Sequence, residues 1–199
     1  MGQKRVSENL EIEFKTLLSI EEFSRTVDYF QLKEKQFFTQ TNYYFDSADF
    51  QLKEKHIGLR VRTLSNNAEI TLKIPEEVGL LEINDTISID EAQHIVASAT
   101  LPNSGNVYNR LTTLGINKND LRLIGSLTTK RAEIKLPQGL LALDESWYNE
   151  QHDFELELEV DDPYNGKADF LSLLNTLNIK ESPSPNKIQR MMMSSKEKD

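Results

Sequence analysis

The chain has 199 residues, of which 38% are hydrophobic and 28% are charged, a balance that suits one soluble domain with its own packed core. It contains no cysteine, which excludes disulfide frameworks, thiol catalysis and cysteine-based metal sites. The formal net charge of −9 disfavours general binding of nucleic acid, which requires a basic surface, but leaves room for a small anion in a local basic pocket.

The start of the chain gives an expectation about its location in the cell. Residues 1–9 lack the apolar run of a signal peptide. No stretch approaches the roughly 18 apolar residues that a membrane-spanning helix requires. We therefore expect a cytoplasmic protein that does not bind membranes.

Several segments alternate strictly between apolar and polar residues, and this period of two is typical of β-strands with two unlike faces. Neighbouring predicted strands are close in sequence, which favours an antiparallel sheet or barrel with helices packed outside it. In chain order, the strands are predicted around 10–15, 36–46, 59–62, 70–74, 81–84, 121–136, 140–147 and 154–160.

Helices are predicted between these strands. Two of them follow a serine that precedes a glutamate by three positions, the capping-box pattern in which each residue satisfies a backbone N–H of the other. A Ser-Pro pair near the end of the chain predicts another helix start, because proline is tolerated in the first turn. The predicted helices are 20–34 after Ser19, 89–99 after Ser88, 104–115, 167–178, and a short helix from Ser184-Pro185 that carries Lys187 and Arg190.

The chain shows no internal repeat and no linker, so residues 1–193 are expected to form a single domain. The remaining residues, 194–199, are polar, and we expect them to form a disordered tail.

Charged residues are sorted by sign along the predicted strands. Side chains at alternate positions share one face, so Arg60 and Arg62 lie together, and Glu155, Glu157 and Glu159 form an acidic row. Each row can be the solvated face of an amphipathic strand. However, three aligned glutamates repel one another unless cations lie between them. A barrel with apolar residues outside and charged residues inside, around an ionic ligand, would account for both rows.

Such rows suit a triphosphate bound together with a divalent metal. A triphosphate carries about four negative charges, and Lys and Arg side chains bind its oxygens. Mg²⁺ and Mn²⁺ prefer carboxylate and water oxygens, and can polarise a phosphoryl oxygen. Glutamates beside arginines supply both kinds of group.

A family resemblance joins these observations. Residues 11–15, Glu-Ile-Glu-Phe-Lys, resemble the ExExK signature of the CYTH, or triphosphate tunnel metalloenzyme, family. The match covers residues 8–190, and the ordered set of segments is far more specific than any one of them. The other segments are Tyr44-Phe45-Asp46, Gly58-Leu59-Arg60-Val61-Arg62, Thr71-Leu72-Lys73, Glu82, Lys130-Arg131, Leu143-Asp144, residues 154–159, and Lys187 with Arg190.

The resemblance implies an α+β fold with an antiparallel eight-stranded β-barrel, a tunnel that holds the triphosphate, and helices packed outside. It also implies Mg²⁺ or Mn²⁺ as cofactor, and catalytic roles for Glu11, Glu13 and Lys15. The residues implied to bind phosphate are Lys15, Arg60, Arg62, Lys73, Arg131 and Lys187. The carboxylates implied to hold metal, directly or through water, are Glu11, Glu13, Asp144, Glu155, Glu157 and Glu159.

A few residues have open roles. Glu133 and Lys135 share the parity of Arg131, so they are candidates to point the same way. Glu82 either binds metal or orients a neighbouring base. Arg190 either faces inward or lies on the surface of the last helix.

The leading hypothesis is a metal-dependent hydrolase that cleaves the terminal phosphoanhydride of a small triphosphate-containing molecule. Inorganic tripolyphosphate is the favoured substrate, because no base-recognition pattern is visible. One alternative is a nucleoside or thiamine triphosphatase, or an adenylate cyclase. Another is a non-catalytic triphosphate- or polyphosphate-binding module, because binding and hydrolysis use the same residues.

Overall fold

The computed structural model describes residues 8–195 and divides them into two compact units. Unit 1 comprises residues 8–10 and 41–126, and unit 2 comprises residues 11–40 and 127–195. Each unit contains paired antiparallel strands with helices packed against them, which confirms the predicted α+β class. The nine strands of the described residues exceed the expected eight, because Ile12 separates two short strands where the sequence predicted one over 10–15.

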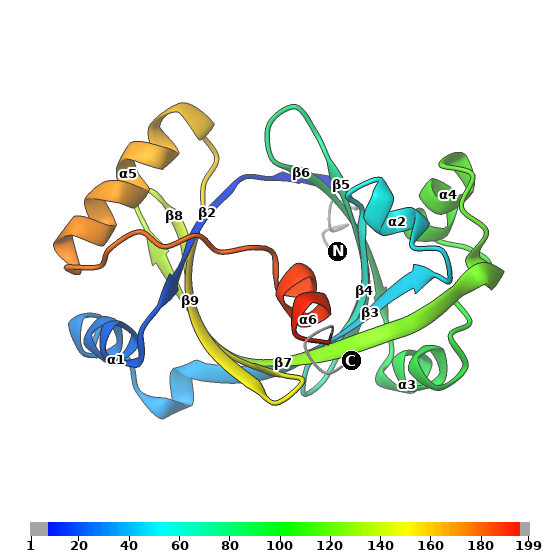
Figure 1. Ribbon diagram of the computed structural model, residues 1–199, viewed down its shortest axis with the longest axis horizontal. Coiled ribbons are helices and arrows are strands. Elements are labelled where there is room, and N and C mark those ends of the chain that lie inside the picture. The colour runs from blue at the N-terminus through cyan, green and yellow to red at the C-terminus, as the bar shows by residue number, and fades with distance from the viewer. Residues whose placement is uncertain (1–7, 196–199) are drawn as a thin grey trace, which may run out of the picture. The chain divides into compact units, whose positions relative to one another are not determined.

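Unit 1 is a sheet with helices on one face (Figure 1). Its strands follow the order β1-β6-β5-β4-β3, and β3 begins in unit 2. The elements are β1 (Glu8–Glu11), β3 (Phe37–Ser47), α2 (Gln51–Glu54), β4 (Gly58–Thr63), β5 (Ala68–Pro75), β6 (Leu80–Ile87), α3 (Ile89–Ser98) and α4 (Asn106–Thr113).

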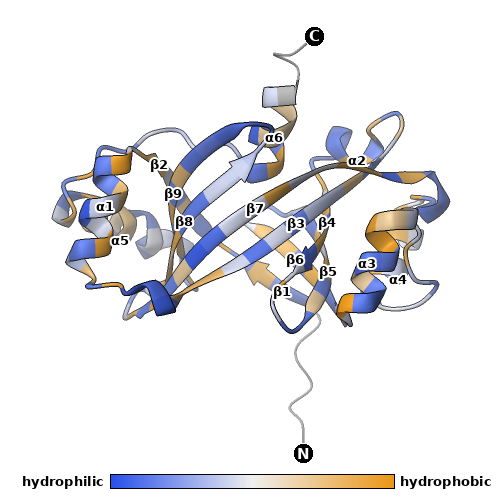
Figure 2. Ribbon diagram, turned by 90° about the horizontal axis from the view of Figure 1, so that it is seen from below, coloured by the Kyte–Doolittle hydropathy of each residue, from blue (hydrophilic) through white to orange (hydrophobic). Residues whose placement is uncertain are grey.

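The core of unit 1 lies between the sheet and helices α3 and α4. Leu59 of β4, Leu72 of β5 and Ile83 of β6 are fully buried and pack against Ile95 and Leu111 of these helices. Because side chains alternate along a strand, the residues between them face the other side of the sheet. Figure 2 shows this alternation of apolar and polar residues along the strands.

Unit 2 has the strand order β7-β8-β9-β2, and β7 begins in unit 1. Helices α1 and α5 cover one face of this sheet, where Leu156, Leu158 and Phe170 are buried together. The elements are β2 (Glu13–Leu18), α1 (Ile20–Tyr29), β7 (Leu121–Leu136), β8 (Gly139–Tyr148), β9 (Gln151–Glu159), α5 (Pro163–Thr176) and α6 (Lys187–Ser195).

Local capping interactions explain where the helices begin. Both predicted capping boxes are present, Ser19 with Glu22 in α1 and Ser88 with Glu91 in α3. Helix α5 begins four residues before the predicted 167, because the side chain of Asp162 caps it and proline occupies its first position.

Two further predicted helix boundaries are wrong. The helix expected over 20–34 ends at Tyr29, and Gln31 has a positive φ of 52° that the helix cannot contain. The last helix begins at Lys187 rather than at Ser184, because the Ser184 hydroxyl donates to the Glu155 carboxylate and is not used as a cap. Ser194 and Ser195 end this helix, so only residues 196–199 of the expected tail remain, and they lie outside the described residues.

The β8–β9 hairpin contacts helix α6. Its turn residues, Asn149 and Glu150, both have positive φ, as in type I′ turns. Asn149 Nδ2 donates to the Met191 carbonyl at 2.8 Å. Beside the turn, the only tryptophan of the chain, Trp147, stacks on His152 with ring centroids 5.1 Å apart and planes 8° from parallel.

None of the helices within residues 8–195 has both the length and the apolar character needed to cross a bilayer.

Candidate functional site

Unit 2 presents a row of acidic side chains on the face of its sheet opposite the apolar core. Leu156 and Leu158 of β9 point into that core, so Glu155 and Glu157 point to the other face. The β8–β9 register places Glu155 directly opposite Asp144. Neighbouring strands therefore bring three carboxylates together, which we call the carboxylate group: Asp144, Glu155 and Glu157.

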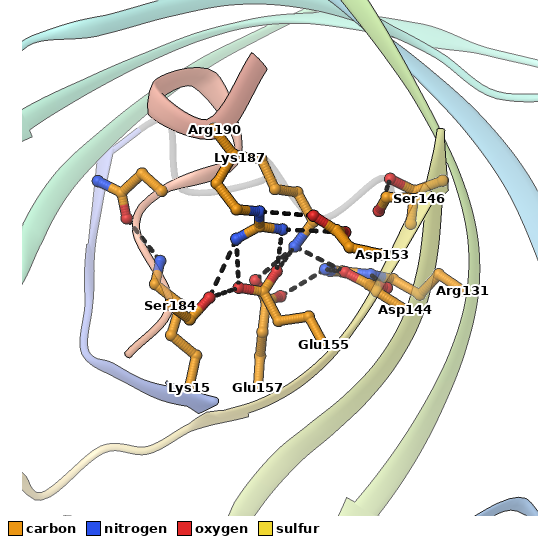
Figure 3. Close-up of polar contacts among 12 residues, drawn as sticks. Lys15, Arg131, Asp144, Ser146, Asp153, Glu155, Glu157, Ser184, Lys187 and Arg190 are labelled. Atoms are coloured by element: carbon orange, nitrogen blue, oxygen red, sulfur yellow. Dashed lines mark hydrogen bonds and ion pairs between the residues drawn. The ribbon is translucent and has the colours of Figure 1, made fainter. Parts of the chain in front are cut away.

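Lys187, the first residue of α6, places its ammonium among these carboxylates (Figure 3). Nζ lies 2.9 Å from Asp144 Oδ2 and 2.7 Å from Glu157 Oε1, and it also donates to Glu155 Oε2. A positive charge in the first turn of a helix opposes the helix dipole. The ion pairs with the carboxylate group are therefore what stabilises Lys187 in this position.

Arg131 of β7 is a second cation in contact with the carboxylate group. Its Nε and Nη2 donate to the two oxygens of Asp144 at 2.7 and 2.6 Å, a bidentate pair. Nη2 also donates to Glu157 Oε2 at 2.5 Å. The β7–β8 register, which sets Arg131 opposite Asp144, positions both contacts. Glu133, of the same strand parity, lies 3.9 Å from Arg131 Nη1.

These cations keep the carboxylates of Asp144 and Glu157 ionised. Burial raises the pKa of the Glu157 carboxyl, but the charges of Lys187 and Arg131 outweigh burial and hold it well below its ordinary value. Asp144 shows the same balance: burial raises its pKa, and Arg131 and Lys187 lower it below the usual value. Burial lowers the pKa of Lys187, but the three carboxylates raise it well above its usual range.

The carboxylate group fits a divalent metal. One oxygen from each of its three residues lies within 4.8 Å of the others. Carboxylate oxygens are the hard ligands that Mg²⁺ and Mn²⁺ prefer. These oxygens already surround a cation, the Lys187 ammonium, so the electrostatic field at this point favours positive charge.

Lys15 and Glu13 of β2 lie beside this group. The β2–β9 register sets Lys15 opposite Glu157. Lys15 Nζ donates to Glu13 Oε1 at 2.5 Å and to Asn186 Oδ1 at 2.6 Å. The ExExK segment therefore places a third cation next to the acidic row.

The carboxylates expected to hold metal are distributed along the strands. Three of the six form the carboxylate group, and the other three lie outside that group among the residues that the structure describes. Glu13 pairs with Lys15, and Glu159 lies opposite Glu13 in the β2–β9 register. Glu11 ends β1.

Sequence reasoning did not select three residues that contact this site. Asp153 and Ser184 bind Arg190, and Asn186 binds Lys15. Asp153 shares the strand parity of Glu155, so the period of two was a usable signal for it. Ser184 and Asn186 lie in an irregular segment whose sequence carries no such pattern. Arg190 itself faces inward and is only 8% exposed.

Unit 1 has a charged face of its own, formed by β4 and β5. Arg62 Nε donates to Asn42 Oδ1 at 3.0 Å, and its Nη1 lies 3.4 Å from Glu69 Oε1. Arg60 has a buried Nε with no hydrogen-bond partner among the residues that the structure describes. Because a buried donor without an acceptor costs free energy, an anionic oxygen at Arg60 would be stabilising.

Glu82 of β6 lies against Lys73 of β5 in unit 1. Lys73 Nζ is 3.1 Å from Glu82 Oε2, and Asn84 Nδ2 donates to Glu82 Oε1 at 2.8 Å. Burial raises the pKa of Glu82, but the charges of Lys73 and Arg60 and the Asn84 hydrogen bond lower it to about 2. Of the two roles left open by the sequence, these contacts favour the one in which Glu82 orients a neighbouring basic side chain, that of Lys73.

Comparison with known proteins supplies the family. The model of the CYTH domain family matches residues 9–192. The chain belongs to the CYTH domain family. A relative of this CYTH protein from Bacillus subtilis (strain 168), named "Putative triphosphatase YjbK", is 39% identical over 185 residues, which are 93% of this chain and 95% of the relative.

Solved structures share the fold of this CYTH protein. A Bacillus halodurans protein, described as a "putative adenylate cyclase", is 41% identical with a TM-score of 0.89, over 93% of this chain and 98% of that one. The Hippeastrum protein HpAC1 is 22% identical with a TM-score of 0.79, over 92% of this chain and 96% of that one. At that identity, the second likeness supports the fold alone.

Proposed function

We propose that this CYTH protein is a triphosphatase that uses a divalent metal, Mg²⁺ or Mn²⁺, to cleave the terminal phosphoanhydride of a triphosphate. The name of the Bacillus subtilis relative supports the reaction. Inorganic tripolyphosphate is the substrate that we favour, because the motifs supply phosphate and metal ligands but no pattern for recognising a base. The family match spans residues of both units, which supports our view of 1–193 as one functional domain.

The observation that carries the proposal is the direct contact of two partly buried cations with the carboxylate group in unit 2. Lys187 and Arg131 can neutralise phosphate oxygens, and the carboxylates can hold a metal. Both kinds of group lie within hydrogen-bonding distance of one another, so a phosphate bound to the cations lies next to the metal ligands.

The metal would be held by Asp144, Glu155 and Glu157, directly or through water. When bound, it supplies positive charge that polarises a phosphoryl oxygen and helps to activate water. Arg131 and Lys187 stabilise the charge that develops on the phosphoryl oxygens. Because Asp144 orients the Arg131 guanidinium through two hydrogen bonds, this donor is aligned before the substrate binds.

Further basic residues are proposed to bind phosphate oxygens. Lys15 lies beside the carboxylate group in unit 2. In unit 1, the buried Nε of Arg60 has no hydrogen-bond partner within the described part of the chain, and Arg62 and Lys73 share its charged face. Glu11, Glu13 and Glu159 remain proposed as further metal or water ligands.

Phosphate release from a panel of substrates tests the proposal. Purified protein is incubated with tripolyphosphate, ATP or thiamine triphosphate, in the presence of Mg²⁺, Mn²⁺ or EDTA. We expect metal-dependent release, fastest from tripolyphosphate. Glu157→Gln should reduce turnover by about 10–100-fold, because it removes one charge from the carboxylate group. Glu181→Gln, which alters an exposed ion pair with Lys167 in the same unit, is the matched control.

Two results would change the conclusion. Tight, metal-dependent binding of tripolyphosphate without turnover under any metal would favour the non-catalytic binding module. Faster release from ATP or thiamine triphosphate would keep the reaction but replace the substrate.

An adenylate cyclase is the second candidate, because a protein 41% identical to this one is described in those terms. The same cations and metal ligands can bind ATP. Formation of cyclic AMP and pyrophosphate from ATP, in place of phosphate, would favour this alternative.

A further inference from the structure

Arg190 of α6 is a buried arginine whose guanidinium lies between two acidic residues of β9 (Figure 3). Its Nε donates to Asp153 Oδ2 and its Nη1 donates to Glu155 Oε1, each at 2.9 Å. Asp153 and Glu155 are two positions apart on one strand, so they project from the same face. A single guanidinium therefore spans both carboxylates.

The surroundings hold this guanidinium in a single orientation. Tyr148 OH donates to Asp153 Oδ2 at 2.5 Å, which fixes the outer carboxylate. Arg190 Nη1 also donates to the Pro185 carbonyl at 2.6 Å and to Ser184 Oγ at 3.0 Å. These bonds connect β9 with the segment that precedes α6.

Glu155 connects Arg190 with the carboxylate group. Its Oε1 accepts from Arg190 Nη1 and from the Ser184 hydroxyl. Its Oε2 accepts from Lys187 and, at 3.3 Å, from Arg190 Nη2. Glu155 is completely buried, so its carboxylate has few alternative partners. Arg190 therefore contacts both oxygens of the Glu155 carboxylate, one of which also binds Lys187.

We propose that Arg190 is a positioning residue: it holds the Glu155 carboxylate so that Oε2 faces the site of the metal and Lys187. The role concerns the orientation of the Glu155 carboxylate, which Arg190 contacts directly, and requires no contact between Arg190 and the substrate. This inference rests on the proposed function, since it concerns the same metal site. Partners that orient metal ligands typically change metal affinity or activity by about 10–100-fold when removed.

Metal binding without substrate tests the role of Arg190. The dissociation constant for Mn²⁺ is measured from the electron paramagnetic resonance signal of the free ion, with circular dichroism to verify folding. We expect Arg190→Gln to weaken Mn²⁺ binding by about tenfold or more. Arg25→Gln is the matched control, because Arg25 is another arginine of unit 2 with backbone partners, the carbonyls of Leu177 and Asn178. This substitution should leave the constant unchanged.

A second variant separates positioning from a general loss of stability. Asp153→Asn removes the charge that holds Arg190 but leaves the carboxylate group intact, and it should weaken Mn²⁺ binding in the same direction. Because Asp153 acts through Arg190, adding Asp153→Asn to Arg190→Gln should have no further effect. Arg190→Lys, which keeps the charge, should recover part of the loss.

The outcomes are distinct. A folded Arg190→Gln protein with wild-type Mn²⁺ affinity would overturn the positioning role, and so would independent, additive effects of the two substitutions. If Arg190→Gln fails to fold, Asp153→Asn decides alone: weaker binding supports the role and unchanged binding overturns it. A wild-type protein that binds Mn²⁺ but cleaves no triphosphate would refute the proposed function. The Mn²⁺ dissociation constants of the wild type and the variants would still decide the role of Arg190. A wild-type protein that binds no Mn²⁺ would overturn both.

Discussion

Asp144 shows how strongly single residues depend on their partners in this site. Its side chain is completely buried, and two cations, Arg131 and Lys187, compensate its charge. Burying an ion pair gives little net stability, but removing one partner leaves a charge that water cannot solvate. Residues proposed to act on substrate therefore also support the folded state.

We expect Arg131→Gln to lower the free energy of unfolding by on the order of 3 kcal/mol, because Asp144 loses its bidentate partner. Urea denaturation in EDTA at neutral pH measures the change. Arg122→Gln, which removes an exposed hydrogen bond from the same strand to the Ala48 carbonyl, should cost less, about 1 kcal/mol or below. Equal effects of the two substitutions would show that Asp144 does not depend on Arg131.

The lowered pKa of Glu82 predicts that the stability of the folded protein depends on pH in acid. Its pKa of about 2 in the folded protein is below that of an unfolded chain, so the unfolded state binds more protons in acid. The stabilisation from ionised Glu82 is complete above about pH 4.5 and is lost as the pH falls toward 2.

The corresponding variant is Glu82→Gln. We expect it to be less stable than wild type at pH 7, by on the order of 2 kcal/mol, and the difference should shrink between about pH 4.5 and pH 2. Thermal unfolding across this range measures it. Glu76→Gln, at an exposed loop position, should have an unfolding temperature that changes with pH in the same way as that of the wild type. If Glu82→Gln differed from the wild type by the same amount at every pH, the lowered pKa of Glu82 would be contradicted.

At the scale of elements, strand positions could be predicted well because alternation is a local signal. The segments predicted at 36–46, 121–136 and 140–147 agree with β3, β7 and β8 to within one residue at each end. The capping boxes were also readable, since they depend on residues three apart. The start of α6 was not, because Ser184 binds Glu155, a partner 29 positions away.

The capping box of α3 provides a test at this scale. Ser88→Ala removes the acceptor for the Glu91 N–H, and we expect a loss of about 1 kcal/mol in the free energy of unfolding. Ser88→Gly should cost only a few tenths of a kcal/mol, because glycine is a tolerated cap residue. If alanine and glycine had equal, negligible effects, the cap would contribute nothing to stability.

At the scale of the whole molecule, metal binding and folding should be linked. A ligand that binds only the folded state stabilises it by about 2.7 kcal/mol at a hundred times its dissociation constant. We expect Mn²⁺ to raise the unfolding temperature of the wild-type protein and of Glu181→Gln, but not that of Glu157→Gln. Calorimetry with and without EDTA measures the shift, and a Mn²⁺ shift retained by Glu157→Gln would place the metal elsewhere.

The candidate site could be predicted only in part from the sequence. Motif order selected Arg131, Asp144 and Glu157 as candidates, because each lies on a strand with a recognisable pattern. The pairing among them depends on the β7–β8 and β8–β9 registers, which no local pattern specifies. The contacts of Asp153 with Arg190 also require an irregular segment to return to β9.

The stacked pair of Trp147 and His152 gives this chain a built-in fluorescent reporter. Trp147 is the only tryptophan, it is 39% exposed, and it belongs to the hairpin whose Asn149 binds the backbone of α6. The emission of a single indole depends on the water around it and on the ring that it stacks against. The emission of Trp147 would therefore report a change in its stacking within this hairpin, without any dye attached to the protein.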